Sequence, residues 1–354
     1  MKLRCICFVL GLTALAVIAQ GQAAPQTALA SSKTVKQTWT PPRTADGHPD
    51  LQGFWANNNA TPLERPKVLA GRTTLTDAEV AAMRKKALEL YNGKGDAAFG
   101  DTIFETVWAS LKGSTSGPHQ KAKDEFDSGT GDYSSEWIVQ RVWDNRTSLI
   151  TDPPDGQLPP MTPEGQKRRE LMMVAMRRPA QGPEDRGLSE RCLSYGSPQL
   201  TAGYQSYYQI VETPKSVMIM TEMIHDVRSI PLNGGPHPGA AVEQWLGDSR
   251  GHWDGDTLVI DTTNYKPRAF MSISSEKLHV IERISRSGED TLKYEITIDD
   301  PLTWTKPWSL MIPLQRSAEP VYEYACHEGN EGLAGILAGA RAEEAAAAKQ
   351  QNQK

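Results

Sequence analysis

The feature that most constrains the fold is a succession of short β-type segments in the C-terminal half. These segments are rich in Val, Ile, Tyr and Thr, and Gly, Pro, Asn or Asp separates them at intervals of about ten residues. No helical segment between them is long enough for a parallel crossover, so the pattern predicts an antiparallel sheet. The segments are 205–213, 216–224, 256–263, 278–286, 291–299, 308–314 and 321–326.

Residues 291–299 show the cleanest alternation of apolar and polar side chains. Such alternation is typical of a strand with one dry and one wet face. We therefore expect a mainly β protein, built as an antiparallel β-barrel or half-barrel of lipocalin-like type with N-terminal helices and long loops. The two faces are Leu292, Tyr294, Ile296 and Ile298 on one side, and Lys293, Glu295, Thr297 and Asp299 on the other.

Two helices are predicted before the strands. A capping box at Thr76 and Glu79 begins the first, and the second begins near Pro163 and ends before Pro179. Between them, residues 93–135 are rich in Gly, Ser, Asp and Lys. This region is predicted to form a loop or lid around one short apolar helix.

The N-terminal residues have the pattern of a secretory signal peptide. Two basic residues precede the apolar run 6–19, which is shorter than the roughly 20 residues of a membrane-spanning helix. We predict a signal peptide at 1–23, with cleavage after Ala23 or after Ala30, and a disordered leader at 24–40. The mature protein is then expected to be periplasmic or secreted.

Charge and cysteine content narrow the class of partner. The net charge is −5, and removal of residues 1–23 leaves 36 Lys and Arg against 43 Asp and Glu, a net charge of −7. We expect no nucleic-acid partner, because neutralising phosphates needs a clustered basic surface. No later segment is long or apolar enough to span a membrane. We expect a small-molecule ligand, because the nine tryptophans and ten tyrosines can supply an aromatic lining. Cys192 and Cys326 are expected to pair in an oxidising compartment, and the alternative is two unpaired thiols.

Residues 222–261 hold the densest set of chemically active side chains. Three of the seven histidines lie there, beside aspartates, an arginine and tryptophans. Imidazole titrates near neutral pH and binds metals, so the clustering predicts a site, although no spacing in it fixes one reaction. The set is His225, Asp226, Arg228, His237, Trp245, Asp248, His252 and Trp253.

Glu282 is a further candidate, because it shares a strand face with Leu278, Val280 and Ile284. A carboxylate among aliphatic side chains must be paired, or its pKa must shift. Glu282 is therefore either a catalytic carboxylate inside the sheet or half of a structural ion pair with a neighbouring arginine.

The leading hypothesis is an exported enzyme that acts on a small, partly apolar organic molecule by metal-free general acid/base catalysis. In this hypothesis His225 and His252 handle protons, and Asp226 or Glu282 orients or assists them. Arg228 would hold a negative charge on the ligand or the transition state. The second hypothesis is a periplasmic binding or carrier protein of lipocalin type without catalysis, and a His-rich metal site is a third alternative.

Ligand contacts are expected from the same segment and from the end of the last predicted strand. The motifs HExxH, HxH, CxxC, GxSxG and GxGxxG are absent from the sequence, so no metal ligands are assigned and no cofactor is predicted. The candidate ligand-binding residues are Arg228, His237, Trp245, Trp253, Tyr324, His327 and Glu328.

Residues 41–340 are predicted to form a single β-rich domain, followed by a polar tail at 341–354. The arm DGHPDLQGFW and the later runs HWDGDTLVIDTTNY and YEYACHEGN resemble an uncharacterised family of exported bacterial proteins, and the resemblance extends over 41–344. It implies export and one continuous unit. It implies nothing about a substrate, and it assigns no catalytic residue.

Overall fold

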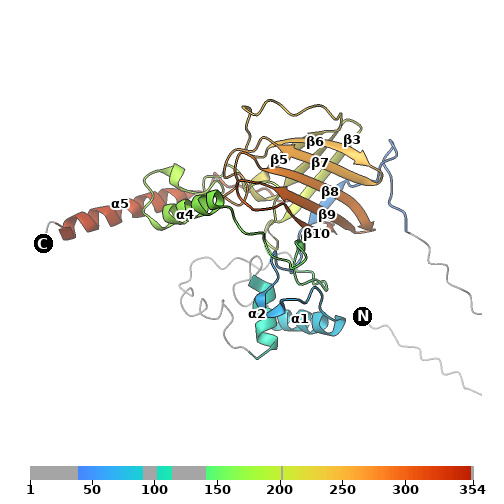
Figure 1. The fold of residues 1–354 in the computed structure, drawn as a ribbon, viewed down its shortest axis with the longest axis horizontal. Helices are drawn as coiled ribbons and strands as arrows, with labels where there is room; N and C mark the ends of the chain where they lie inside the picture. The colour runs from blue at the N-terminus through green and yellow to red at the C-terminus, as the bar shows by residue number, and fades with distance from the viewer. Residues whose placement is uncertain (1–38, 91–101, 114–140, 201, 352–354) are drawn as a thin grey trace, which may run out of the picture. The chain divides into compact units, whose positions relative to one another are not determined.

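The computed structural model describes residues 39–90, 102–113, 141–200 and 202–351. Figure 1 shows these residues in colour. The predicted signal peptide, nearly all of the leader and most of the predicted lid lie outside the described residues.

The protein is mainly β, as predicted. One ten-stranded sheet has the order β5-β4-β3-β1-β10-β9-β8-β7-β6, and β2 pairs with β10 outside this path. All of its ladders are antiparallel. The strands are β1 (Gly53–Ala56), β2 (Ile150–Asp152), β3 (Tyr207–Thr213), β4 (Ser216–Thr221), β5 (Val227–Pro231), β6 (Asp248–Asp254), β7 (Thr257–Thr263), β8 (His279–Gly288), β9 (Thr291–Asp299) and β10 (Trp308–Ser317).

One face of the sheet carries the main hydrophobic core. In β9 buried and half-buried residues alternate along the whole strand, as the sequence predicts. The neighbouring strands β8 and β10 alternate in the same way, and register places their buried residues together, for example Ile296 between Glu282 and Leu310. Trp304 and Trp308 pack edge to face at 5.6 Å between ring centroids within this core.

The sheet curves until its two edge strands, β5 and β6, come alongside each other. No ladder joins these edges among the described residues, so the sheet is not closed into a barrel. At this seam a Cβ on Gly251 would lie 2.9 Å from Cγ2 of Ile230 and 2.8 Å from Cδ2 of Leu232. Close side-chain packing, rather than hydrogen bonding, therefore joins the edges, and a closed lipocalin-like barrel is not confirmed.

Several of the segments that connect the strands lie together at one end of the sheet. Register pairs the end of β1 with the start of β3, and the start of β3 with the end of β4. The end of β7 likewise pairs with the start of β8. The described segments 187–200, 202–206, 222–226 and 264–278 therefore emerge at the same end of the curved sheet.

The predicted helices are present. Thr76 and Glu79 exchange the reciprocal bonds of a capping box, with 2.9 Å from Thr76 N to Glu79 Oε2 and 3.2 Å from Glu79 N to Thr76 Oγ1. A second, smaller core lies between the first two helices and Trp143. The helices are α1 (Asp77–Leu90), α2 (Thr102–Leu111), α4 (Pro163–Arg177) and α5 (Glu331–Gln351), with short 3-10 turns η1 (Lys67–Leu69), η3 (Pro183–Asp185) and η4 (Met223–His225).

Two predicted strands need correction. The strand expected over 216–224 ends at Thr221, because the chain turns through η4, where Ile224 and His225 have positive φ, and returns as β5. The segment 321–326 forms no strand. It is tied instead to loops, since Tyr322 N donates to Glu222 Oε1 at 3.1 Å and Cys326 forms a disulfide.

Candidate ligand-binding pocket

A pocket of about 580 Å³ lies at the end of the sheet described above. Its walls are the segment 187–200 and the turn 268–272, with Leu63 at its side. Hydroxyl groups of Ser189, Ser194 and Ser272 and the guanidinium-bearing Arg268 also belong to the lining. The apolar lining comprises Leu63, Leu188, Pro198, Leu200, Phe270 and Met271.

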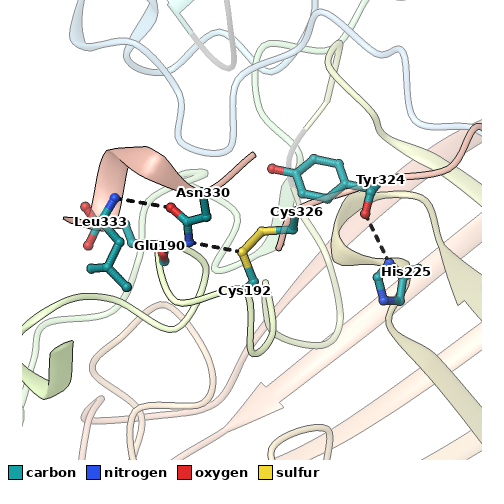
Figure 2. Close-up of a disulfide and its surroundings, with 7 residues drawn as sticks. All are labelled: Glu190, Cys192, His225, Tyr324, Cys326, Asn330 and Leu333. Atoms are coloured by element: carbon teal, nitrogen blue, oxygen red, sulfur yellow. Dashed lines mark hydrogen bonds between the residues drawn. A yellow bond between two sulfur atoms is a disulfide. The ribbon is translucent and has the colours of Figure 1, made fainter. Parts of the chain in front are cut away.

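The first wall is anchored by the disulfide between Cys192 and Cys326, which confirms the predicted pairing. Figure 2 shows Asn330 beside it, where the Asn330 amide donates to Cys192 Sγ at 3.3 Å and to the Glu190 carbonyl at 2.9 Å. Asn330 Oδ1 in turn accepts from Leu333 N at 3.2 Å at the start of α5. The C-terminal segment thus holds the wall from outside.

Asp226 anchors the same wall from the side of the sheet. Its Oδ2 accepts from Ser194 Oγ at 2.9 Å and from Tyr195 N at 3.0 Å. Burial raises the pKa of Asp226, and the hydrogen bonds from Tyr195 and Ser194 and the neighbouring His225 oppose the rise. A carboxylate predicted to act in catalysis therefore lies directly behind the pocket wall.

The second wall is a strained turn. Arg268, Met271 and Ser272 have φ values of 68°, 49° and 58°, a region that residues other than glycine rarely adopt. With Cys192, four of the eight such non-glycine residues in the described part of the chain lie in the two walls. Strain of this kind persists where surrounding contacts enforce it, and it clusters at ligand sites.

Hydrogen bonds with the residues that follow the turn hold its backbone in this strained conformation. Arg268 N donates to the Ser274 carbonyl at 2.8 Å, and Phe270 N donates to Ser274 Oγ at 3.0 Å. Ser275 N donates to the buried carboxylate of Asp300 at 2.7 Å. The turn is therefore fixed by the protein before any ligand arrives.

The two walls meet at Gly196. This glycine has a φ of 92°, and a Cβ there would lie 2.8 Å from the carbonyl oxygen of Ala269. Only glycine adopts this positive φ readily and also leaves room for the Ala269 carbonyl, so any other residue would shift the backbone. Ala269 and Phe270 are themselves buried in the main core, so the pocket floor is continuous with the sheet interior.

Three of the predicted site residues, His225, Asp226 and Tyr324, lie outside the pocket lining, beside the wall that the disulfide anchors. His225 is exposed, and its Nδ1 lies 3.3 Å from the Tyr324 carbonyl oxygen, as Figure 2 shows. Asp226 follows His225 directly. A second hollow of about 490 Å³ lies beside the same disulfide, with Tyr324 in its lining.

Arg228 and Glu282 meet inside the sheet, away from this pocket. Arg228 Nη1 and Nη2 lie 2.5 and 2.7 Å from the two carboxylate oxygens, and the side chains are 8 % and 0 % exposed. Tyr294 also donates to Glu282. Burial alone would lower the pKa of Arg228, but the facing Glu282 outweighs it and raises that pKa. Of the two interpretations of Glu282, the structure displays an ion pair with an arginine; catalysis by Glu282 stays untested.

His237 belongs to a third group, on the outer face of the sheet. Its two ring nitrogens lie 2.7 Å from Asp248 Oδ1 and 3.2 Å from Asp261 Oδ1. Asp261 Oδ1 also lies 2.9 Å from Nε2 of His279, and Arg250 Nε donates to Asp248 Oδ1 at 2.8 Å. These side chains hold the 232–247 loop against β6, β7 and β8.

The other predicted residues are dispersed. His252 is exposed on β6, and Trp253 stacks on His48 with ring centroids 4.6 Å apart. Trp245 packs against the core under Lys266, whose Nζ is 5.0 Å from the ring. The last two, His327 and Glu328, are exposed after the disulfide.

Sequence reasoning missed the residues that line the pocket, above all Ser194, Arg268 and Phe270. The stretch LSYGSPQL directly follows Cys192, and KPRAFMSIS links two predicted strands. A turn-rich stretch beside a cysteine could have directed attention to the first wall. The strain in the second wall leaves no trace in residue type.

No protein-family model matches the chain, and neither the curated proteins nor the solved structures give a significant match. Within the described ranges, no group of three or more His, Cys, Asp or Glu side chains is placed to hold a metal ion. Among the helices that the structure describes, none is long and apolar enough to cross a membrane.

Proposed function

We propose that this protein is an exported small-molecule binding or carrier protein, which holds a partly apolar ligand in the pocket between 187–200 and 268–272. The observation that carries the proposal is the pocket itself, about 580 Å³ in volume, with mixed lining and two walls fixed in advance. Pre-formed concave sites with apolar walls and a few placed polar groups are typical of small-molecule sites.

The placement of the histidines supports binding over catalysis. His225 and His237 are hydrogen-bonded, and His252 and His327 are exposed, while none of them is among the residues that line the pocket. The pocket lies among loops at one end of the curved antiparallel sheet, and small-molecule sites are common at the mouths of β-barrels. Export is supported by the disulfide, since such bonds persist in oxidising compartments, and by the signal-peptide pattern at 1–23.

Native mass spectrometry of the protein purified from its own compartment tests this proposal. We expect a co-purified small molecule in the wild type and its loss in Leu188→Trp, which adds bulk to the pocket lining. Leu171→Trp is the matched control, because Leu171 is 61 % exposed on α4 and should leave the bound mass unchanged. The proposal fails if Leu188→Trp retains the same bound mass as the wild type.

Acid/base catalysis in the same pocket is a second candidate function, and one observation favours it. Asp226 has a raised pKa and is bonded to Ser194 in the pocket wall, where a carboxyl group could exchange a proton through the serine. Incubation of the protein with its co-purified molecule, followed by mass analysis, decides between the two. Chemical conversion that is lost in Asp226→Asn supports catalysis, and an unchanged molecule supports a carrier.

A further inference from the structure

The charge inside the pocket carries information about the ligand. Among the described residues that line it, Arg268 is the only one with a charged side chain. Arg268 is exposed, and within the described part of the chain its guanidinium makes no ion pair. Most arginines near the sheet are engaged, for example Arg228 with Glu282 and Arg283 with Asp254. The guanidinium of Arg268 is thus available to a partner from outside the chain.

A backbone hydrogen bond fixes the position of Arg268 at the pocket. Its backbone has a φ of 68°, and the bond from its N–H to the Ser274 carbonyl at 2.8 Å holds that conformation. Holding a long side chain on a strained backbone costs free energy, so its presence at the pocket requires an explanation in function or in packing. Packing does not supply one, since the side chain is exposed.

Among the described residues that line the pocket, none carries a carboxylate that could pair with the guanidinium. Asp226 lies behind the first wall, where its Oδ2 is occupied by Ser194 and Tyr195, and Asp226 is not among the lining residues. The remaining polar lining consists of hydroxyl, amide and backbone groups, which can donate hydrogen bonds to an anion. The apolar side chains Leu63, Leu188 and Phe270 complete a surface with one positive end.

On the strength of the proposed binding function, we infer that the ligand is a small monoanion with an apolar body. Specifically, it is a carboxylate with an aromatic or aliphatic body. Its carboxylate pairs with Arg268, and its body lies between the apolar side chains of the two walls. Arginine suits this task because its planar fork of N–H donors matches the two oxygens of a carboxylate.

Isothermal titration of the mature protein with 2-naphthoate and with its neutral amide, 2-naphthamide, tests the inference. We expect the wild type to bind the carboxylate about tenfold more tightly than the amide, which is the effect of one charge-assisted contact. Arg268→Gln should lose this preference and bind both probes as the wild type binds the amide. Arg283→Gln, which alters an exposed arginine outside the pocket, should retain it.

The outcomes separate this inference from the function on which it rests. Equal binding of the two probes by the wild type overturns the carboxylate preference and leaves small-molecule binding intact. Loss of the preference in Arg283→Gln would overturn the role of Arg268. The absence of any binding, together with no co-purified molecule, would overturn both. The comparison of probes on the wild type needs no variant, so misfolding of Arg268→Gln leaves the test valid.

Discussion

At the scale of the residue, the Arg228–Glu282 pair is the most demanding feature of the core. Both side chains are buried and bonded at 2.5 and 2.7 Å, so either one alone would be an uncompensated charge. The alternation in β8 predicted a buried carboxylate at Glu282. The identity of its partner on β5 could not be predicted, because it depends on how far the sheet curves.

Removal of one partner should therefore be costly. Arg228→Met is expected to lower the free energy of unfolding by about 3–5 kcal/mol, measured by urea denaturation. Arg228→Met combined with Glu282→Gln should lose clearly less than the sum of the single variants. The matched control is Arg283→Met, which breaks the exposed pair with Asp254 and should leave the denaturation midpoint near that of the wild type. Equal effects of Arg228→Met and Arg283→Met would contradict this account.

Glu212 gives the protein a defined pH dependence. Burial raises the pKa of Glu212 to about 7 from its ordinary value of 4.5, against the opposing bond from Leu51 N. Because the folded protein holds this proton more tightly than the unfolded chain, its stabilisation is present below about pH 4.5 and is lost as the pH rises through 7.

Glu212→Gln should remove this dependence. At pH 8 the variant is expected to be more stable than the wild type by on the order of 1 kcal/mol, a figure reduced for the partial exposure of the group. At pH 5 the difference should shrink, since the wild-type side chain is then largely protonated. Denaturant titrations at pH 5 and pH 8 measure this difference in the free energy of unfolding. A difference that grows toward pH 5 would refute the raised pKa of Glu212.

At the scale of the element, the disulfide joins residues that are 134 positions apart in the sequence. The cysteine count and the expectation of export predicted this pairing, but they did not show that it fixes the wall of a pocket. Replacement of both cysteines in Cys192→Ala/Cys326→Ala should lower the free energy of unfolding by about 3–5 kcal/mol, because a long closed loop is released. Reduction of the wild type with dithiothreitol should give the same loss, whereas an unchanged midpoint would show that the bond contributes nothing.

The packing between the edge strands β5 and β6 can be tested at Gly251. Gly251 packs against Ile230, so Gly251→Ala should cost about 1–3 kcal/mol through overpacking, measured by thermal or urea denaturation. Gly239→Ala is the control, since a Cβ at Gly239 meets nothing within 4 Å and should be tolerated. A tolerated Gly251→Ala would mean that the edges are not held in contact. Neither β5 nor β6 was predicted, because their short sequences lack clear alternation.

At the scale of the whole molecule, the sequence predicted the class of fold and the elements with strong periodicity. Helices α1 and α4 and strands such as β9 begin and end close to the expected residues. The candidate site was less predictable, because histidines that are near in sequence point to different surfaces once β5, β6 and the 232–247 loop are formed. Pocket residues come instead from loops whose meeting at one end depends on the full strand order.

The central claim is that a ligand binds between 187–200 and 268–272, and not at the histidine-rich segment. Amide hydrogen–deuterium exchange of the protein, measured with and without saturating 2-naphthoate, tests it directly. We predict slower exchange in 187–200 and 268–272, with no change in 234–261. Protection confined to 234–261, around His237 and His252, would contradict the account.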